Sequence, residues 1–160
     1  NSKKNVGTDI KICMTFAIGK EINYNNPAEN HFSLKGMRVL VVEDNELNTE
    51  VVKFMLENNG IIVDCVEDGV QALNSFEKSN PGYYAMILMD VLMPRMNGLE
   101  ATRRIRTLQR KDASSIPIIA MSANAFSDDI MRGKLAGMND YLAKPLDEEM
   151  LIRAIRKCLK

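Results

Sequence analysis

The stretch that most constrains the fold is residues 86–98, where an apolar run of strand length ends abruptly at Asp90. A loop that holds Pro94 and Gly98 follows, and a helical pattern begins behind it. An unbroken apolar run of this length predicts a strand buried on both faces, as in a parallel sheet. Sites in open parallel sheets form at the carboxyl ends of the strands, so Asp90 is the first candidate functional residue.

The size and charge of the chain narrow the classes of function. A length of 160 residues suits one domain with some extra length, large enough for a core without disulfides. Basic and acidic residues are equal at 21 each, which argues against general binding to nucleic acid or acidic membranes. The three cysteines have no ligand spacing and predict a reducing, cytoplasmic location. No signal peptide or membrane span is recognisable, and because the chain starts at Asn1 we expect a piece of a longer protein.

The first 35 residues differ from the rest. Residues 8–18 alternate apolar and polar, which predicts a half-buried antiparallel strand without an evident hairpin partner. Residues 19–35 are polar and Asn-rich, contain the only histidine, His31, and are interpreted as a linker. An unpaired edge strand seeks a partner, so we expect residues 1–18 to be disordered or to pair with another chain.

From Gly36 onward, five strand patterns alternate with five helical patterns. The strands are expected at 37–42, 61–66, 85–89, 116–121 and 140–143. Alternation of this kind predicts an α/β fold with a parallel sheet, right-handed crossovers and helices on both faces.

Two helix faces are also predicted. Arg103, Arg104 and Arg106 should form a solvated basic face, and the last helix, capped by Asp147, should turn Met150, Leu151, Ala154, Ile155 and Leu159 inward.

Chain direction places all strand ends on one edge of the sheet, where Glu43, Asp44, Asp90, Ser122 and Lys144 should meet. Three carboxylates at such an edge repel one another unless a cation offsets them. Oxygen ligands select a hard cation, and Mg²⁺ is the expected one. A metal and a lysine beside one aspartate suit transfer of a phosphoryl group to a carboxylate, with Ser122 as a donor to a phosphoryl oxygen. Each residue alone has a structural explanation as a cap or turn former, but their joint placement favours a function.

Four blocks carry a family resemblance. Residues 41–45, 89–98, 121–125 and 141–145 resemble the signature blocks of two-component receiver domains, in order and at the proper spacing, within residues 36–160. The resemblance implies a doubly wound, flavodoxin-like fold with five parallel strands in the order 2-1-3-4-5. The amino-acid sequences of residues 43–48 and 136–142 are more similar to those of receivers fused to hybrid sensor histidine kinases than to those of free-standing transcriptional regulators.

The resemblance also implies roles for the residues at the site. Asp90 would accept the phosphoryl group. Asp44, Asp90 and the backbone carbonyl of Leu92 would ligate Mg²⁺, and Glu43 would act through bound water. Lys144 would pair with the phosphoryl group, and its bond to Pro145 would be cis as in the family.

The family switch would act behind the phosphoacceptor. Ser122 would close on the phosphate, Tyr141 would rotate inward, and the face formed by the fourth helix, fifth strand and fifth helix would change. Asn97 stands where the family usually has Asp, outside the reacting centre. The donor would be a phosphohistidine on a histidine kinase or a histidine phosphotransfer domain. His31, the only histidine of this chain, lacks a helical context and is not expected to be the donor. No contact with nucleic acid or membrane is expected.

The start of the chain suggests a parent protein. Gly7-Thr8-Asp9 and the alternating residues after it are similar to the last strand of a histidine kinase ATP-binding domain. The parent would then be a kinase, commonly membrane-anchored, and the receiver would catalyse its own phosphorylation and dephosphorylation.

Three rival functions remain to be tested. A haloacid-dehalogenase-type phosphatase would need an aspartate at position 92, where Leu92 stands. A degenerate receiver that signals without phosphate is disfavoured by the intact site. A DNA-binding regulator is disfavoured because the last helix ends the chain at Lys160. Leu92 and Asn124 would flank the path of a hydrolytic water, and since Leu92 cannot orient water we expect slow self-dephosphorylation.

Overall fold

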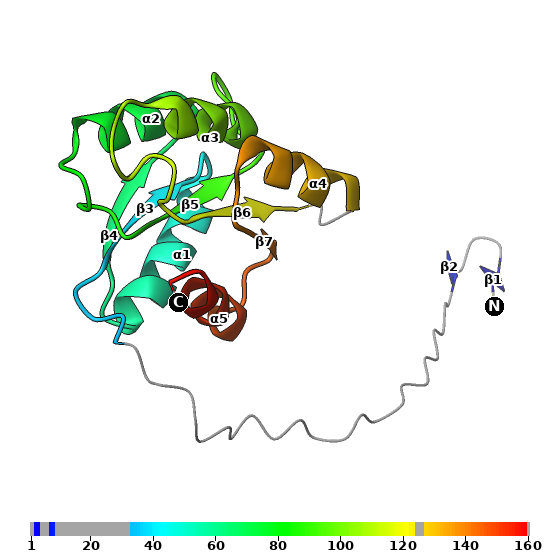
Figure 1. The fold of residues 1–160 in the computed structure, drawn as a ribbon. Helices are drawn as coiled ribbons and strands as arrows, with labels where there is room; N and C mark the ends of the chain where they lie inside the picture. Colours follow the sequence, from blue (N-terminus) through cyan, green and yellow to red (C-terminus); the bar gives the residue numbers. More distant parts are fainter. Residues whose placement is uncertain (1, 4–6, 9–32, 124–126, 160) are drawn as a thin grey trace. The chain divides into compact units, whose positions relative to one another are not determined.

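The computed structural model describes residues 2–3, 7–8, 33–123 and 127–159, and the chain divides into two compact units, 1–31 and 32–160 (Figure 1). In the first unit, β1 (Ser2–Lys3) and β2 (Gly7–Thr8) pair antiparallel, with Ser2 opposite Thr8. The strand expected over 8–18 lies outside the described residues beyond Thr8, as do His31 and most of the predicted linker. The proposal that residues 1–18 come from a kinase ATP-binding domain therefore stays a prediction.

The second unit is built on one parallel sheet of five strands: β3 (Arg38–Val42), β4 (Ile62–Val66), β5 (Met86–Asp90), β6 (Ile118–Ser122) and β7 (Asp140–Ala143). The strands lie in the order β4-β3-β5-β6-β7, which is 2-1-3-4-5 within this sheet and confirms the predicted topology. Every residue of β5 and β6 is buried, because central strands of such a sheet are covered on both faces.

Among the described residues of this unit, four helices connect successive strands and a fifth follows the last strand: α1 (Glu46–Asn58), α2 (Gly69–Lys78), α3 (Gly98–Thr107), α4 (Ser127–Ala136) and α5 (Glu148–Cys158). The side chains of Asn45, Asp68, Asn97 and Asp147 accept backbone N–H groups in the first turns of α1, α2, α3 and α5. Such caps satisfy donors that the helix itself leaves without a partner, so they fix where each helix begins. None of the helices within the described part of the chain is long and apolar enough to cross a membrane.

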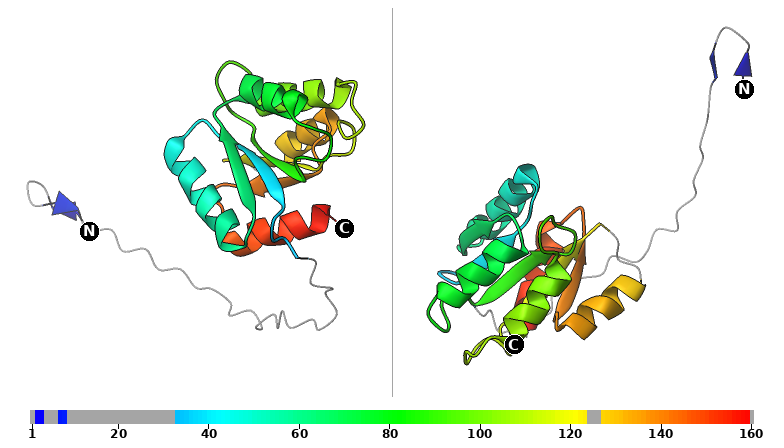
Figure 2. Two further views of the ribbon diagram at one scale, coloured as in Figure 1. Left: turned by 90° about the vertical axis from the view of Figure 1, so that its left-hand side faces the viewer. Right: turned by 90° about the horizontal axis from the view of Figure 1, so that it is seen from above.

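The alternation of side chains along the strands produces two cores. Val39 and Val41 join Leu56 of α1 and Leu151 of α5 on one face of the sheet. On the other face, Leu40 and Val42 join the residues of α2 and α3. Figures 1 and 2 show these two helical layers, with α4 beside α3 and β7. Leu34, which the sequence placed in the linker, is buried in the first core.

Two predicted helix faces are each wrong at one residue, whereas Arg103 and Arg104 are exposed and Leu151, Ala154 and Ile155 are buried as expected. Arg106 is half-buried rather than solvated, and its guanidinium donates to the carbonyl oxygens of Ala113 at 2.8 Å and Gly137 at 2.9 and 3.0 Å. Burial also lowers its pKa. Met150 is exposed, because the buried stripe of α5 is centred on Leu151 and Ile155 and Met150 lies at its margin.

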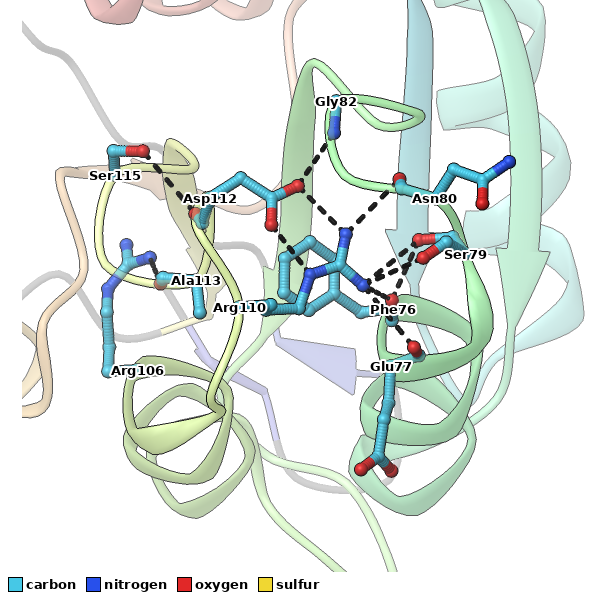
Figure 3. Close-up of polar contacts among 10 residues, drawn as sticks. All are labelled: Phe76, Glu77, Ser79, Asn80, Gly82, Arg106, Arg110, Asp112, Ala113 and Ser115. Carbon is cyan, nitrogen blue, oxygen red and sulfur yellow. Dashed lines mark hydrogen bonds and ion pairs between the residues drawn. The ribbon is translucent and has the colours of Figure 1, made fainter.

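A second arginine joins two loops at the amino-terminal edge of the sheet, away from the strand ends that hold the candidate site (Figure 3). The guanidinium of Arg110 lies 3.9 Å from the centroid of the Phe76 ring and donates to the backbone carbonyls of Phe76 and Ser79. It also pairs with Asp112 at 2.6 Å, and Asp112 accepts the N–H of Gly82 at 2.8 Å. Arg110 thus satisfies carbonyls that the end of α2 leaves without intrahelical partners.

Candidate active site

The predicted site residues follow four neighbouring strands at one edge of the sheet. Glu43 comes directly after β3, Asp90 ends β5, Ser122 ends β6 and Lys144 comes directly after β7. Because all strands are parallel, these positions meet at the carboxyl-terminal edge.

Lys144 joins two buried carboxylates. Its ammonium nitrogen lies 2.5 Å from Glu43 Oε2 and 2.5 Å from Asp90 Oδ2. Glu43 is 2% exposed and Asp90 is 5% exposed, so both carboxylates have lost most of their hydration. Burial acts to lower the pKa of Lys144, but its hydrogen bonds to Asp90 and Glu43 and their negative charges outweigh burial and raise the pKa. The lysine is therefore held as a fixed positive charge.

The carboxylates of Glu43, Asp44 and Asp90 form one acidic cluster. One ligand oxygen from each lies within 4.8 Å of the others, and Asp44 is the exposed member. Three carboxylates and one ammonium leave a formal charge of 1 − 3 = −2. A divalent cation would neutralise this charge, and an all-oxygen ligand set with one side open to solvent fits Mg²⁺, which keeps several waters or phosphate oxygens.

Asn48 is a member of the site whose role sequence reasoning missed. Its side-chain amide donates to Glu43 Oε1 at 2.8 Å, while Lys144 occupies Oε2. Asn48 reaches Glu43 because Asn45 caps α1 and accepts the backbone N–H of Asn48 at 3.0 Å. The first turn of α1 thus fixes the Glu43 carboxylate from one side and Lys144 fixes it from the other.

The loop after Asp90 is also fixed at its start. The backbone N–H of Leu92 donates to Asp90 Oδ1 at 3.0 Å, and the N–H of Gly98 donates to the carbonyl of Val91 at 3.1 Å. A Cβ atom at Gly98 would clash with the carbonyl oxygen of Asp90, so glycine is required for this close approach. The side chain of Leu92 is 67% exposed beside the site, and Asn124 lies outside the described residues.

The two residues predicted to act in the switch lie on neighbouring strands. Ser122 is buried at the end of β6, and its carbonyl accepts the N–H of Lys144 at 2.8 Å. Tyr141 on β7 is half-buried and packs against the core on the α2 and α3 face. Its ring passes close to Gly133 of α4, since a Cβ atom there would lie 3.7 Å from two ring carbons. The Lys144–Pro145 peptide bond is cis, as expected.

Comparison with known proteins identifies the family. Residues 39–156 match the model of the response regulator receiver domain. This match spans most of the chain, so the chain belongs to the response regulator receiver domain family, with the fold and topology described above.

The similar proteins include hybrid kinases and a transcriptional regulator. The chain is 38% identical over 120 residues to hybrid signal transduction histidine kinase I of Dictyostelium discoideum. The aligned residues are 74% of this chain but only 7% of that protein. It is also 38% identical over 122 residues to the transcriptional regulatory protein CseB of Streptomyces coelicolor, covering 76% of this chain and 49% of CseB. The chain thus spans a small part of the longer relatives that it matches.

A solved structure bears on the metal. The receiver domain of sensor histidine kinase PA1611 from Pseudomonas aeruginosa, described with a magnesium ion coordinated in its active site cleft, is 41% identical to this chain. The TM-score is 0.70, and the similarity covers 78% of this chain and 98% of that one. The fold and an acidic cluster are therefore present here in a family that includes a magnesium-binding member.

Proposed function

We propose that this chain is the phosphoacceptor domain of a two-component phosphorelay, in which Asp90 accepts a phosphoryl group from a phosphohistidine in a reaction that requires Mg²⁺. The observation that carries the proposal is the position of Lys144 between Glu43 and Asp90, beside the exposed carboxylate of Asp44. Membership of the receiver family supports the same reaction.

In the proposed step, a carboxylate oxygen of Asp90 attacks the phosphorus atom of the phosphohistidine. The new P–O bond forms as the P–N bond breaks, the imidazole nitrogen keeps the electron pair, and the product on Asp90 is an acyl phosphate. Lys144 holds a positive charge next to the attacking carboxylate and can follow the transferred oxygens. Such transfer depends mainly on positioning and on neutralising charge.

The cation would be held by Asp44, Asp90 and the backbone carbonyl of Leu92, with Glu43 acting through bound water. Bound there, Mg²⁺ supplies positive charge to the phosphoryl oxygens. The residues fit this role because the cluster is made only of oxygens, carries a formal charge of −2 and remains open at Asp44.

The added phosphoryl group would act as a switch. It adds a charge of about −2 and new acceptor oxygens at the strand edge. Ser122 would donate to one of these oxygens, and Tyr141 would move inward behind it, changing the face formed by α4, β7 and α5. The half-buried position of Tyr141 beside Gly133 of α4 supports this coupling.

The donor must bring its histidine to Asp90, so a surface next to the acidic cluster has to contact it. α1 begins two residues after Asp44 and exposes Leu47, Val51 and Phe54, at i, i+4 and i+7 on one side of the helix. Leu47 is 73% exposed and Phe54 is 65% exposed. An apolar stripe of this kind would pack against a helix that carries the phosphohistidine, on a histidine kinase or a histidine phosphotransfer domain.

Incubation of the chain with acetyl phosphate and Mg²⁺, followed by intact-mass measurement, tests the proposed function. The wild-type chain should gain one phosphoryl group, whereas Asp90→Asn, and wild type with EDTA, should gain none. Equal labelling of Asp90→Asn would reject Asp90 as the acceptor, and no labelling of wild type would favour a receiver that signals without phosphate.

The same assay addresses the phosphatase alternative. A haloacid-dehalogenase-type enzyme would release inorganic phosphate from acetyl phosphate over many turnovers, using an acid/base residue at position 92. Leu92 cannot act in that way, so phosphate release should not exceed the slow decay of phospho-Asp90. We propose separately that the parent protein is a histidine kinase. Sequencing of the gene that encodes this chain tests this, because a histidine kinase domain should be encoded together with the receiver.

A further inference from the structure

The loop from Val91 to Asn97 joins the phosphoacceptor strand β5 to α3, and its later half lies on the start of α2. The N–H of Gly69 donates to the carbonyl of Met96 at 3.1 Å. A Cβ atom at Gly69 would lie only 2.6 Å from that carbonyl oxygen, so the backbones approach closely. The later half of the loop is therefore attached to the first turn of α2.

Asp68 is the centre of this attachment. Its side chain is 0% exposed, and its two carboxylate oxygens have different partners. Oδ1 caps α2 by accepting the N–H groups of Val70 at 2.8 Å and Gln71 at 2.9 Å. Oδ2 accepts no hydrogen bond from the described residues in standard geometry, and its ionic partner is the guanidinium of Arg95. Since a buried charge is costly without a partner, the Arg95 contact is the compensation for Oδ2.

Arg95 contacts Asp68 from an unfavourable backbone conformation. Its φ is +63°, and it is the only non-glycine residue with positive φ among residues that the structure describes. Glycine or asparagine would occupy this left-handed conformation at lower cost. Neither could place a guanidinium on Asp68. Strained residues of this kind are typical of functional sites, where surrounding contacts hold them in place.

The attachment bears on the metal site through Leu92. The loop is fixed before Leu92 by the bond from its N–H to Asp90 Oδ1, and after it by Arg95 on Asp68 and Met96 on Gly69. Between these points, Leu92 is exposed. The side chain of Leu92 therefore adds no buried contact, and the loop is held by the anchors on either side of it.

We propose that Asp68 and Arg95 are a positioning pair that holds the loop in the conformation in which the Leu92 carbonyl faces the metal. The inference rests on the proposed function, because it assigns the pair a role in Mg²⁺ binding. Neither residue touches the reacting atoms, and the pair acts through the backbone of residues 91–97.

Calorimetric titration of the full chain with Mg²⁺ tests the pair. Arg95→Asn keeps a residue that tolerates positive φ but removes the charge, and Asp68→Asn keeps a capping oxygen but removes the charge of Oδ2. Each should weaken Mg²⁺ binding about 10-fold, the lower end for groups that orient a metal ligand. The double variant should be no weaker than either single one, because the two residues act as one contact. Arg95→Lys should restore part of the affinity.

Arg104→Asn is the matched control. Arg104 is 54% exposed against 58% for Arg95 and also pairs with an acidic residue, Glu100, but on the surface of α3. Its loss should leave Mg²⁺ binding within 2-fold of wild type, roughly the effect of a surface pair.

A second readout needs no metal. Amide hydrogen exchange at Leu92 and Met93, measured with EDTA, should be faster in Arg95→Asn than in wild type, while exchange in β5 stays unchanged. Unchanged exchange in the loop together with unchanged Mg²⁺ affinity in Arg95→Asn would overturn the proposal, even if Asp68→Asn failed to fold. If wild type itself binds no Mg²⁺, the proposed function fails, and the exchange measurement still decides whether the pair holds the loop.

Discussion

The ammonium nitrogen of Lys144 lies 2.5 Å from Asp90 Oδ2, although the two residues are 54 positions apart in the chain. The same nitrogen contacts Glu43 Oε2 at 2.5 Å. One cation thus serves two buried carboxylates, and Asp44 adds a third negative charge nearby. This shared lysine offsets part of the repulsion among the three carboxylates, and the remaining formal charge of −2 can still attract a divalent cation.

Replacing Lys144 by Met should show both effects. Without Mg²⁺, the free energy of unfolding should fall by about 3 kcal/mol, since removing one partner leaves buried charges uncompensated. Addition of Mg²⁺ should recover more stability in the variant than in wild type, because the remaining cluster is more negative. Urea unfolding with EDTA and with Mg²⁺ measures this. Lys157→Met, which removes an exposed lysine paired with Asp140, should change stability little, and equal losses in the two variants would contradict the prediction.

The apolar stripe of α1 should matter only for a protein donor. Leu47→Asp is expected to slow phosphoryl transfer from a phosphorylated histidine phosphotransfer domain by about 10-fold, the effect of losing one anchor residue of an interface. Its labelling by acetyl phosphate, which needs no docking surface, should not change. Leu135→Asp, at an equally exposed leucine of α4, is the control and should leave both rates unchanged. Loss of acetyl phosphate labelling in Leu47→Asp would indicate damage to the site instead.

Leu92→Asn should shorten the lifetime of phospho-Asp90. The leucine is exposed beside the acceptor and offers no group that could orient water, whereas an asparagine amide does. We expect hydrolysis to accelerate by about 10-fold, less than the contribution of a full general acid or base. The decay of the phosphorylated species, followed by mass after removal of acetyl phosphate, is the measurement. Leu92→Met keeps the side chain apolar, so its phospho-Asp90 should decay at the wild-type rate. An unchanged rate in Leu92→Asn would contradict the role of Leu92 in the lifetime of phospho-Asp90.

The contact of Arg110 with Asp112 predicts a dependence of stability on acid. The hydrogen bond from Arg110 lowers the pKa of Asp112 to about 2, with burial opposing and the N–H of Gly82 adding to the shift. A carboxylate with a lowered pKa in the folded state stabilises the fold above its unfolded pKa of 3.8 and loses that contribution as the pH falls toward about 2.

The test compares wild type with Asp112→Asn, in which the amide oxygen can still accept the N–H of Gly82. The stability advantage of wild type should shrink by about 1 kcal/mol between pH values of about 5 and 2, less than the full shift implies because solvent screens the pair. Urea unfolding at several pH values measures this difference. An advantage that does not vary with pH in this window would show that the pair contributes through packing on Phe76 alone.

Much of this protein could be predicted from local sequence patterns. The unbroken apolar run that ends at Asp90 predicts a buried strand, because only a strand covered on both faces tolerates such a run. The alternation of strands and helices predicts a parallel sheet, and direction alone then gathers Glu43, Asp90, Ser122 and Lys144 at one edge. Asp147 likewise marks the start of the last helix, since the preference of a capping residue is local.

The choice of partner for each long side chain was decided by the tertiary structure. Nothing in the spacing of Arg103, Arg104 and Arg106 indicates that the third turns toward the carbonyl of Gly137, because that carbonyl is brought there by the packing of α3 against α4. The contacts of Arg95 with Asp68 and of Arg110 with Phe76 likewise join segments that meet only after the sheet has formed. Sequence by itself determined which elements form and which edge carries the chemistry, because those depend on periodicity and chain direction. The pairing of charges depends on distances of a few ångströms between loops, and these exist only in the folded chain.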